Sequence, residues 1–238
     1  MEDRFQKTLK TRILQQIMTE RRTIRAFDPQ PPETSQVEQV LSAGQMAPFA
    51  NFGTQAGEVR HFYVFPAGSS AREQIEQAFH TASAQAERNF QPGVSRWWLR
   101  LKEGLFFKKN YSPRSMEQLR LMLEQASRSS GHFNNLSNAP LLILVAEQRR
   151  GPGLAQWLDR QSLAHCMQNM WLMATALDLA YQPLSPLALL AEDERVCALL
   201  SLAPGQYALD GFLLGLPSGE ARMTRELPFQ PEQITWFK

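Results

Sequence analysis

The chain has 238 residues, of which 43% are hydrophobic and 20% charged, and its formal net charge is +2. This apolar content excludes a largely disordered chain, and the length suits one large domain with its own core. Two cysteines are too few for a disulfide scaffold, and the near-neutral charge gives no sign of a nucleic-acid binder. We therefore expect one globular domain over residues 1–238.

The chain shows no membrane-spanning or secretory pattern. Its longest core-like apolar run, residues 139–146, is much shorter than the ~20 residues that span a bilayer. The N-terminus is polar and mixed in charge, unlike a secretory signal. We expect a cytoplasmic protein with no membrane partner.

The first third of the chain alternates helical and extended patterns. Apolar residues spaced four apart predict a helix over residues 5–17, and a basic segment at 21–27 follows it. Capping-box patterns at Ser35–Glu38 and Ser70–Glu73 predict the starts of two further helices. Between them, aromatic and β-branched residues over 60–65 predict a strand.

The rest of the chain mixes further helices with strands. In order, the pattern predicts a helix over 115–130, a buried strand over 140–146, a long helix over 154–179, an extended segment ending in a loop over 181–186, a helix over 192–200 and a strand over 207–216. The second half of the long helix is apolar nearly all round, so we expect it to be buried on all sides. This mixture indicates an α/β or α+β fold.

Several common chemistries have no motif in this chain. There is no phosphate-binding glycine loop and no nucleophile elbow, and the scattered histidines give no basis for a metal site. The most informative segment is Arg21-Arg22-Thr23-Ile24-Arg25. Three guanidinium groups and a hydroxyl within five residues suit a phosphate dianion, because guanidinium forks bind its oxygens in pairs. A solvated basic turn is the alternative interpretation of the spacing alone.

Five motifs, in the expected order, resemble the nitroreductase-like FMN-dependent oxidoreductases. They are Arg21–Phe27, Ala47–Gln55, Asn138–Pro140, Gln168–Leu179 and Leu202–Pro217. The resemblance, to a divergent member of that family, implies an α+β sandwich with a mostly antiparallel central sheet wrapped by helices. It also implies a homodimer with FMN bound at the subunit interface.

The resemblance also implies a set of FMN-binding residues. Carried over by position, they are Arg21, Arg22, Thr23, Arg25, Asn51, Gln55, Pro183, Leu184, Ser185, Arg222 and Arg225. The first three would hold the phosphate and ribityl chain, and either Arg222 or Arg225 would complete the phosphate site. Arg25 would lie near the pyrimidine edge of the flavin, where a cation stabilises the anionic reduced form.

The remaining positions concern the flavin ring and the substrate. Asn51 and Gln55 would lie beside the ring, while Pro183–Ser185 would cover its other side near N5. A helical insert at about 90–135, rich in aromatic and basic residues, has three interpretations. It forms a lid that selects the substrate, it docks an acidic carrier protein, or it packs against the partner subunit.

Three functions remain open from the sequence. The first is an oxidoreductase in which NAD(P)H reduces FMN, which then reduces a nitroaromatic, quinone or related small acceptor. The second is an FMN-dependent dehydrogenase or oxidase of a biosynthetic intermediate, such as a peptide, azoline or carrier-bound acyl group, with O2 reoxidising the flavin. The third is a binding or scaffold subunit without redox chemistry. We predict no catalytic residue, because flavin hydride transfer needs no obligatory side-chain acid or base.

Overall fold

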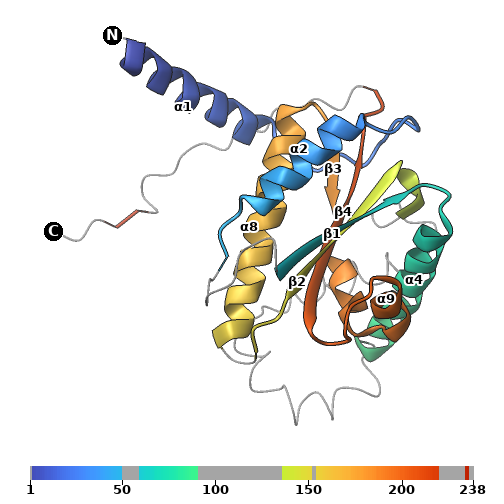
Figure 1. Ribbon diagram of the computed structural model, residues 1–238. Helices are drawn as coiled ribbons and strands as arrows, with labels where there is room; N and C mark the ends of the chain where they lie inside the picture. The colour runs from blue at the N-terminus through green and yellow to red at the C-terminus, as the bar shows by residue number, and fades with distance from the viewer. Residues whose placement is uncertain (1, 50–58, 91–135, 152–153, 220–233, 236–238) are drawn as a thin grey trace.

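A single antiparallel sheet forms the centre of the protein, for which we use a computed structural model that describes residues 2–49, 59–90, 136–151, 154–219 and 234–235. Within these residues the sheet has four strands in the order β1-β2-β4-β3 (Figure 1). They are β1 (Arg60–Pro66), β2 (Leu141–Gln148), β3 (Ala180–Pro183) and β4 (Tyr207–Gly215), and every neighbouring pair is antiparallel. The expected α+β fold with an antiparallel sheet is confirmed.

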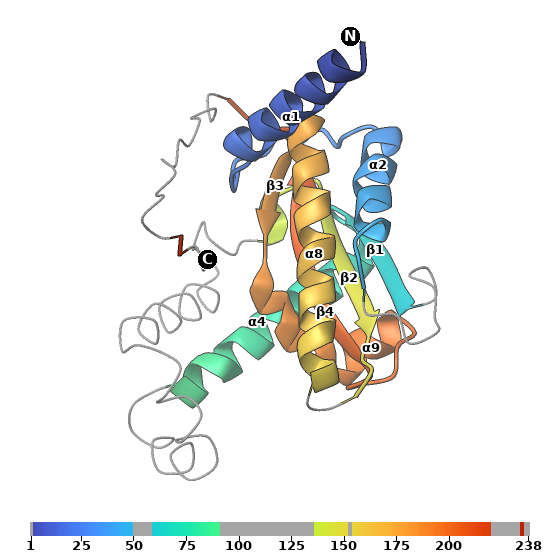
Figure 2. The same ribbon diagram turned by 90° about the vertical axis from the view of Figure 1, so that its left-hand side faces the viewer.

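Helices cover both faces of this sheet. Their bounds are α1 (Glu2–Glu20), α2 (Thr34–Gln45), α4 (Ser70–Phe90), α8 (Leu154–Ala176) and α9 (Glu194–Leu199), with 3-10 segments η1 (Leu136–Asn138) and η2 (Ser185–Glu192). α2 and α8 pack on one face, while α4, α9 and η2 pack on the other (Figure 2). α1 projects away from the sheet in both views.

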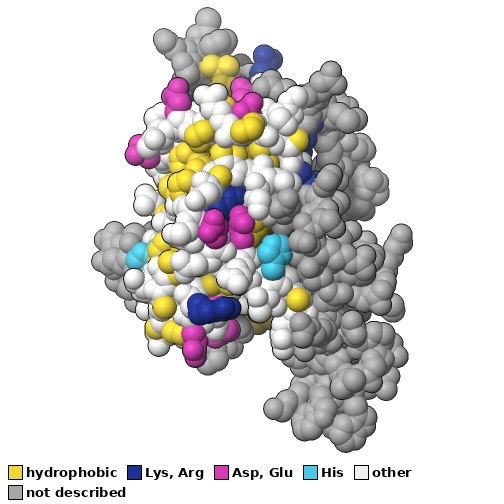
Figure 3. Space-filling model, turned by 90° about the vertical axis from the view of Figure 1, so that its right-hand side faces the viewer, with side chains coloured by type: hydrophobic (Ala, Val, Ile, Leu, Met, Phe, Trp, Pro, Cys, Tyr) yellow, Lys and Arg dark blue, Asp and Glu magenta, His cyan; other side chains and the backbone are white. Residues whose placement is uncertain are grey.

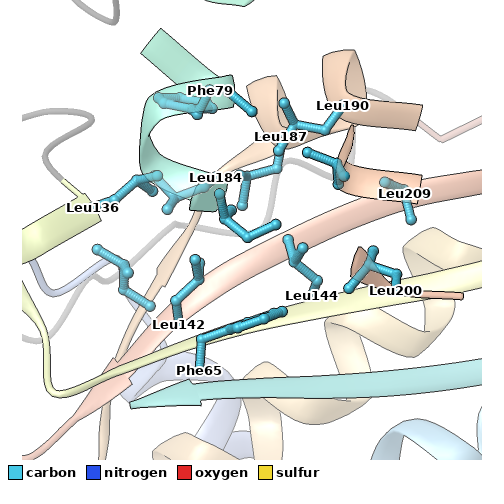
Figure 4. Close-up of a cluster of buried hydrophobic side chains, with 14 of the residues drawn as sticks. Phe65, Phe79, Leu136, Leu142, Leu144, Leu184, Leu187, Leu190, Leu200 and Leu209 are labelled. Carbon is cyan, nitrogen blue, oxygen red and sulfur yellow. The ribbon is translucent and has the colours of Figure 1, made fainter. Parts of the chain in front are cut away.

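The uninterrupted apolar run of β2 is explained by burial on both faces. Leu142 and Leu144 point into the core under α4 and η2, where Phe79 also packs (Figure 4). Ile143 and Val145 point the opposite way, into the core under α2 and α8. Successive strand residues face opposite sides, so a strand enclosed by helices on both faces favours a run of apolar residues.

The two predicted helix starts are displaced by a residue or two. α2 begins at Thr34 with Glu33 as its cap, and the Glu33 N–H donates to Gln36 Oε1 at 3.1 Å. In α4 the hydroxyl of Ser69 accepts from the Arg72 N–H at 3.3 Å. Ser35 and Ser70 therefore both lie inside their helices, and the residues before the helices, Glu33 and Ser69, occupy the cap positions.

Two expectations about the second half of the chain differ from what the single chain shows. The loop expected after Pro183 is the 3-10 segment η2. The second half of α8 is not buried on all sides within this chain, since Gln168 and Ala176 are exposed and Met173 is half-buried. α8 covers the sheet with one face and leaves the other uncovered by the described residues.

Other expectations fall on segments that the structure does not describe. The helix expected over 115–130 lies outside the described residues, as does nearly all of the insert expected at about 90–135. Among the helices that are described, none is both long enough and apolar enough to cross a membrane.

Candidate functional site

The basic segment, residues 21–25, is fixed against the edge of the sheet as soon as α1 ends. The Arg21 N–H donates to the Ile17 carbonyl at 2.9 Å, which completes the last turn of α1. Three residues later the Ile24 N–H donates to the carbonyl of Tyr181 in β3 at 3.1 Å. The three arginines therefore lie beside β3 on a backbone held from both ends.

The chain after the basic segment is joined to the end of β4. The Asp28 N–H donates to the Leu216 carbonyl at 2.8 Å, and the Ser218 N–H donates to the Ala26 carbonyl at 3.1 Å. An antiparallel bridge between Phe27 and Pro217 lies between these bonds. The basic segment is thus anchored on two strands that belong to the centre of the fold.

Three of the motifs found in the sequence meet at one contact. A Cβ atom added to Gly215 would lie 2.9 Å from Cδ1 of Phe27 and 2.8 Å from Cδ of Pro140. Both distances are too short for a real side chain, so only glycine fits between these rings. Gly215 therefore permits the close approach that seats the segment ending in Phe27.

An aromatic stack beneath α8 supports the basic segment. The Arg21 guanidinium lies 4.3 Å from the ring centroid of Trp171 in α8, and Trp171 Nε1–H donates to the Arg22 carbonyl at 3.2 Å. Trp171 stacks on Tyr181 at 5.3 Å, which stacks on Phe212 at 4.2 Å. A guanidinium that lies over a ring keeps its in-plane N–H groups directed outward, where they can bind an anion.

The basic segment is partly shielded from water. Arg21, Arg22 and Thr23 are half-buried, whereas Arg25 is exposed. Burial nevertheless lowers the pKa of Arg25. Arginine begins from so high a pKa that the group stays cationic, and partial desolvation strengthens its attraction for an anion. The arrangement can bind a phosphate group.

The structure brings Pro183–Ser185 close to the basic segment along the short strand β3. Tyr181, which accepts the bond from Ile24, lies two residues before Pro183. The Leu184 N–H donates to the Gly211 carbonyl at 2.8 Å, and the Leu184 side chain is buried in the core. A ring placed here would therefore contact Pro183 and the backbone, not the Leu184 side chain.

Four of the expected FMN-binding residues lie outside the described residues. They are Asn51, Gln55, Arg222 and Arg225. The two parts of the expected site that can be placed, the basic segment and Pro183–Ser185, both lie at β3.

A buried charge cluster joins α8 to the sheet on the α2 side. Arg60 Nε and Nη2 donate to Glu147 Oε2 at 2.9 and 2.7 Å, and neither side chain is exposed. Arg60 Nη2 also donates to Ser162 Oγ at 3.0 Å. Arg150 pairs with Glu147 at 3.3 Å and also with Asp159. Every charge in this cluster has a partner, which is the requirement for burying charges at all.

Two further residues of interest were missed from the sequence. Trp171 anchors the basic segment, but it reads as one more apolar residue in a long helix. Asp210 lies in the apolar strand β4, and burial raises its pKa to about 6 although it accepts the Gly211 N–H bond. The only signal for Asp210 was an acidic residue inside an otherwise apolar strand.

Comparison with solved structures shows the same fold in nitroreductases. A nitroreductase with bound FMN from Bacteroides fragilis is 19% identical, with a TM-score of 0.61 over 94% of this chain and 98% of that one. The FMN-dependent nitroreductase NfnB from Mycobacterium smegmatis, in complex with NADPH, is 18% identical, with a TM-score of 0.59 over 96% and 99%. A nitroreductase with bound FMN from Desulfitobacterium hafniense is 18% identical, with a TM-score of 0.57 over 95% and 98%.

Comparison of the sequence with curated proteins and comparison with models of protein families give different results. No curated protein matches this chain. The family model described as "Nitroreductase family", however, matches residues 18–216, from the end of α1 to the residue after β4. This match includes the basic segment, Pro183–Ser185 and all four strands of the sheet, so the chain belongs to the nitroreductase family.

Proposed function

We propose that this protein is an FMN-dependent oxidoreductase whose basic segment, residues 21–25, holds the phosphate of FMN. The observation that carries the proposal is the anchoring of this segment and the residues that follow it. Ile24 is bonded to β3, and residues 26–28 are bonded to the chain at the end of β4, by three backbone hydrogen bonds in all. A solvated basic turn would need no such anchoring. Membership of the family and the FMN-bound neighbours support the same assignment.

The residues present fit the phosphate of FMN. Arg21 and Arg22 offer guanidinium forks and Thr23 offers a hydroxyl on one rigid stretch of backbone. The Arg21 guanidinium lies over the Trp171 ring, and this contact restricts the positions of its donors. Fixed donors lose little side-chain freedom on binding, and charge-assisted bonds to phosphate are among the strongest in proteins.

Bound FMN supplies hydride transfer, accepting electrons from one partner and passing them to another. The task of the chain is to position the flavin and to tune its electronic properties. Pro183 and the following backbone would lie beside the ring, while Arg25 would place positive charge near the pyrimidine edge. We propose that Asn51, Gln55 and one of Arg222 and Arg225 complete the site.

NAD(P)H is the electron donor that we propose, with a small nitroaromatic, quinone or related molecule as acceptor. The complex of the neighbour NfnB with NADPH supports this donor. Oxidation of a biosynthetic intermediate, with O2 as the final acceptor, is the second candidate from the sequence. No contact among the described residues favours it, so the reductase is the function tested first.

We also propose that the protein is a homodimer. Four large apolar side chains on the projecting helix α1 are about half exposed: Leu9 (41%), Ile13 (48%), Leu14 (51%) and Met18 (49%). An apolar stripe on a helix that extends away from its own core needs a second surface to cover it. The face of α8 left uncovered within the chain is adjacent, since α1 contacts α8.

The test of the FMN site is a titration of the purified protein with FMN, followed by flavin absorbance and fluorescence. We predict that the wild type binds one FMN per chain. Arg22→Gln should weaken FMN binding by about tenfold or more, because a charge-assisted bond contributes roughly 1.5–3 kcal/mol. The matched control is Arg195→Gln, an exposed arginine in α9. Equal FMN affinity in the two variants would contradict the assignment.

A further inference from the structure

A cavity of about 350 Å³ lies between the first half of α8 and the start of β4. β3 pairs with β4 only over residues 212–215. The earlier residues of β4 therefore have one edge that β3 does not cover, and residues 208–210 on this part of β4 line the cavity. The lining residues are Arg149, Asp159, Arg160, Leu163, Ala164, Ala188, Ala208, Leu209 and Asp210. None of them belongs to the basic segment or to Pro183–Ser185, so the cavity is not part of the proposed phosphate site.

Two of the four charged residues in the lining are already neutralised by partners. Asp159 is 1% exposed and pairs with Arg150, which also donates to it through its backbone N–H at 3.0 Å. Arg149 pairs with Glu192 at 2.9 Å and donates to the Gly205 carbonyl at 3.0 Å. These pairs set the shape of the cavity and leave little charge for a ligand.

The other two charged residues, Asp210 and Arg160, have no ion-pair partner among the described residues. Asp210 is half-buried, and its Oδ1 accepts one bond, from the Gly211 N–H at 2.8 Å. Arg160 is exposed, and its guanidinium lies 5.9 Å from the ring centroid of Trp157. The two charges line one cavity without forming an ion pair with each other. Apart from Arg149 and Asp159, which are held in ion pairs, the other lining residues are apolar.

We propose that this cavity binds a small organic zwitterion, with its ammonium group at Asp210 and its carboxylate at Arg160. The apolar body of the ligand would lie against Leu163 and Leu209. A carboxylate with one hydrogen bond in apolar surroundings gains most from a cation that brings its own N–H donors. The volume is at the small end of the range for ligand sites, which suits a molecule the size of an amino acid or dipeptide. A phosphate would be repelled by Asp210.

The ammonium contact depends on the ionisation of Asp210. The titratable and charged groups around it are Cys166, Asp159 and Arg160 from α8, Tyr181 from β3, and Arg149 after β2. Burial raises the pKa of both Cys166 and Tyr181, so these two stay protonated and neutral. Asp159 and Arg149 are held in ion pairs. Binding of the zwitterion should therefore strengthen as the pH rises through about 6, where Asp210 loses its proton.

The experiment uses three probes built on the same benzene ring: 4-(aminomethyl)benzoate, benzylamine and benzoate. Each is titrated calorimetrically into the full chain at about pH 8, with and without FMN. The zwitterion should bind about tenfold more tightly than either singly charged probe. In Asp210→Asn its affinity should fall to that of benzoate, and in Arg160→Gln to that of benzylamine. Arg195→Gln, remote from the cavity, should leave all three affinities unchanged.

Three results would overturn the proposal: no probe binding at about 10 mM, equal binding of all three probes, or an unchanged preference in both cavity variants. Asn has the shape of Asp and keeps the acceptor for Gly211, and Arg160 is exposed, so both variants should fold, which circular dichroism checks. Because the probes are tested without FMN as well, a failure of this site is distinguishable from a failure of the proposed flavin site.

Discussion

Two groups of charged side chains pack against α8, and they are built in opposite ways. In the Arg60–Glu147 cluster every charge meets an opposite charge or a hydrogen-bond partner, and neither central side chain is exposed. At Asp210 a carboxylate in apolar surroundings has one backbone N–H and no cation among the described residues. The first arrangement is what a fold needs in order to bury charge. The second costs the folded state free energy and is better explained by a ligand than by stability.

The surface provides a third setting for comparison. On the face shown in Figure 3, Lys and Arg side chains near the middle and the bottom of the view lie beside Asp and Glu side chains, and the described residues form no extended basic patch. The pair Arg149–Glu192 is of this kind, with side chains 32% and 65% exposed. Water screens such pairs, so breaking one of them should lower the free energy of unfolding much less than breaking the buried cluster.

The largest effect is expected at the buried cluster. Glu147→Gln should lower the free energy of unfolding by about 3–5 kcal/mol, because it leaves the Arg60 guanidinium buried without its counter-charge. Urea denaturation followed by circular dichroism measures this loss. Glu194→Gln, an exposed carboxylate in α9, is the control and should change stability little. A loss below about 1 kcal/mol in Glu147→Gln would show that the cluster does not bury its charge.

A change of opposite sign is expected at Asp210. The rise of its pKa from 3.8 to about 6 corresponds to up to about 3 kcal/mol of destabilisation when the group is ionised. This cost is absent below about pH 4, grows between about pH 4 and 6, and is complete above that range. Asp210→Asn should therefore stabilise the protein at about pH 8, and the gain should vanish near pH 4.

Thermal and urea unfolding across this pH range check the prediction for Asp210. The wild type itself should lose stability as the pH rises through the same range, relative to Asp210→Asn. A variant that is less stable than the wild type at about pH 8 would mean that Asp210 has a counter-charge after all.

The smallest effect is expected at the surface pair. Glu192→Gln should change the free energy of unfolding by less than about 1 kcal/mol, and added salt should reduce the change further. Parallel denaturation at low and high salt measures it. A loss as large as that of Glu147→Gln would remove the distinction between the buried and exposed settings.

The local parts of the fold could be predicted from the sequence. The apolar run that begins β2 and the caps and breakers around the helices placed most elements to within a few residues. The basic segment was also found, because its residues are consecutive. The meeting of Phe27, Pro140 and Gly215 was not predictable, because these residues are far apart in the chain and only the tertiary structure joins them.

The errors have physical reasons. The apolar surface of α8 predicted complete burial, but periodicity cannot tell which face packs on the sheet and which is left for another surface. Asp210 was overlooked because a single acid in a strand becomes informative only when its surroundings are known. The roles of Asn51, Gln55, Arg222 and Arg225 stay predictions, since these residues lie outside the described part of the chain.

The central claim is that the protein passes electrons through FMN, and anaerobic reduction tests it most directly. The FMN-loaded protein is mixed with NADPH without oxygen while the flavin band near 450 nm is followed. We predict that the band bleaches within the time of mixing to minutes and returns on addition of a nitroaromatic or quinone. FMN that stays bound and oxidised in the presence of NADPH and NADH would contradict the proposed reductase.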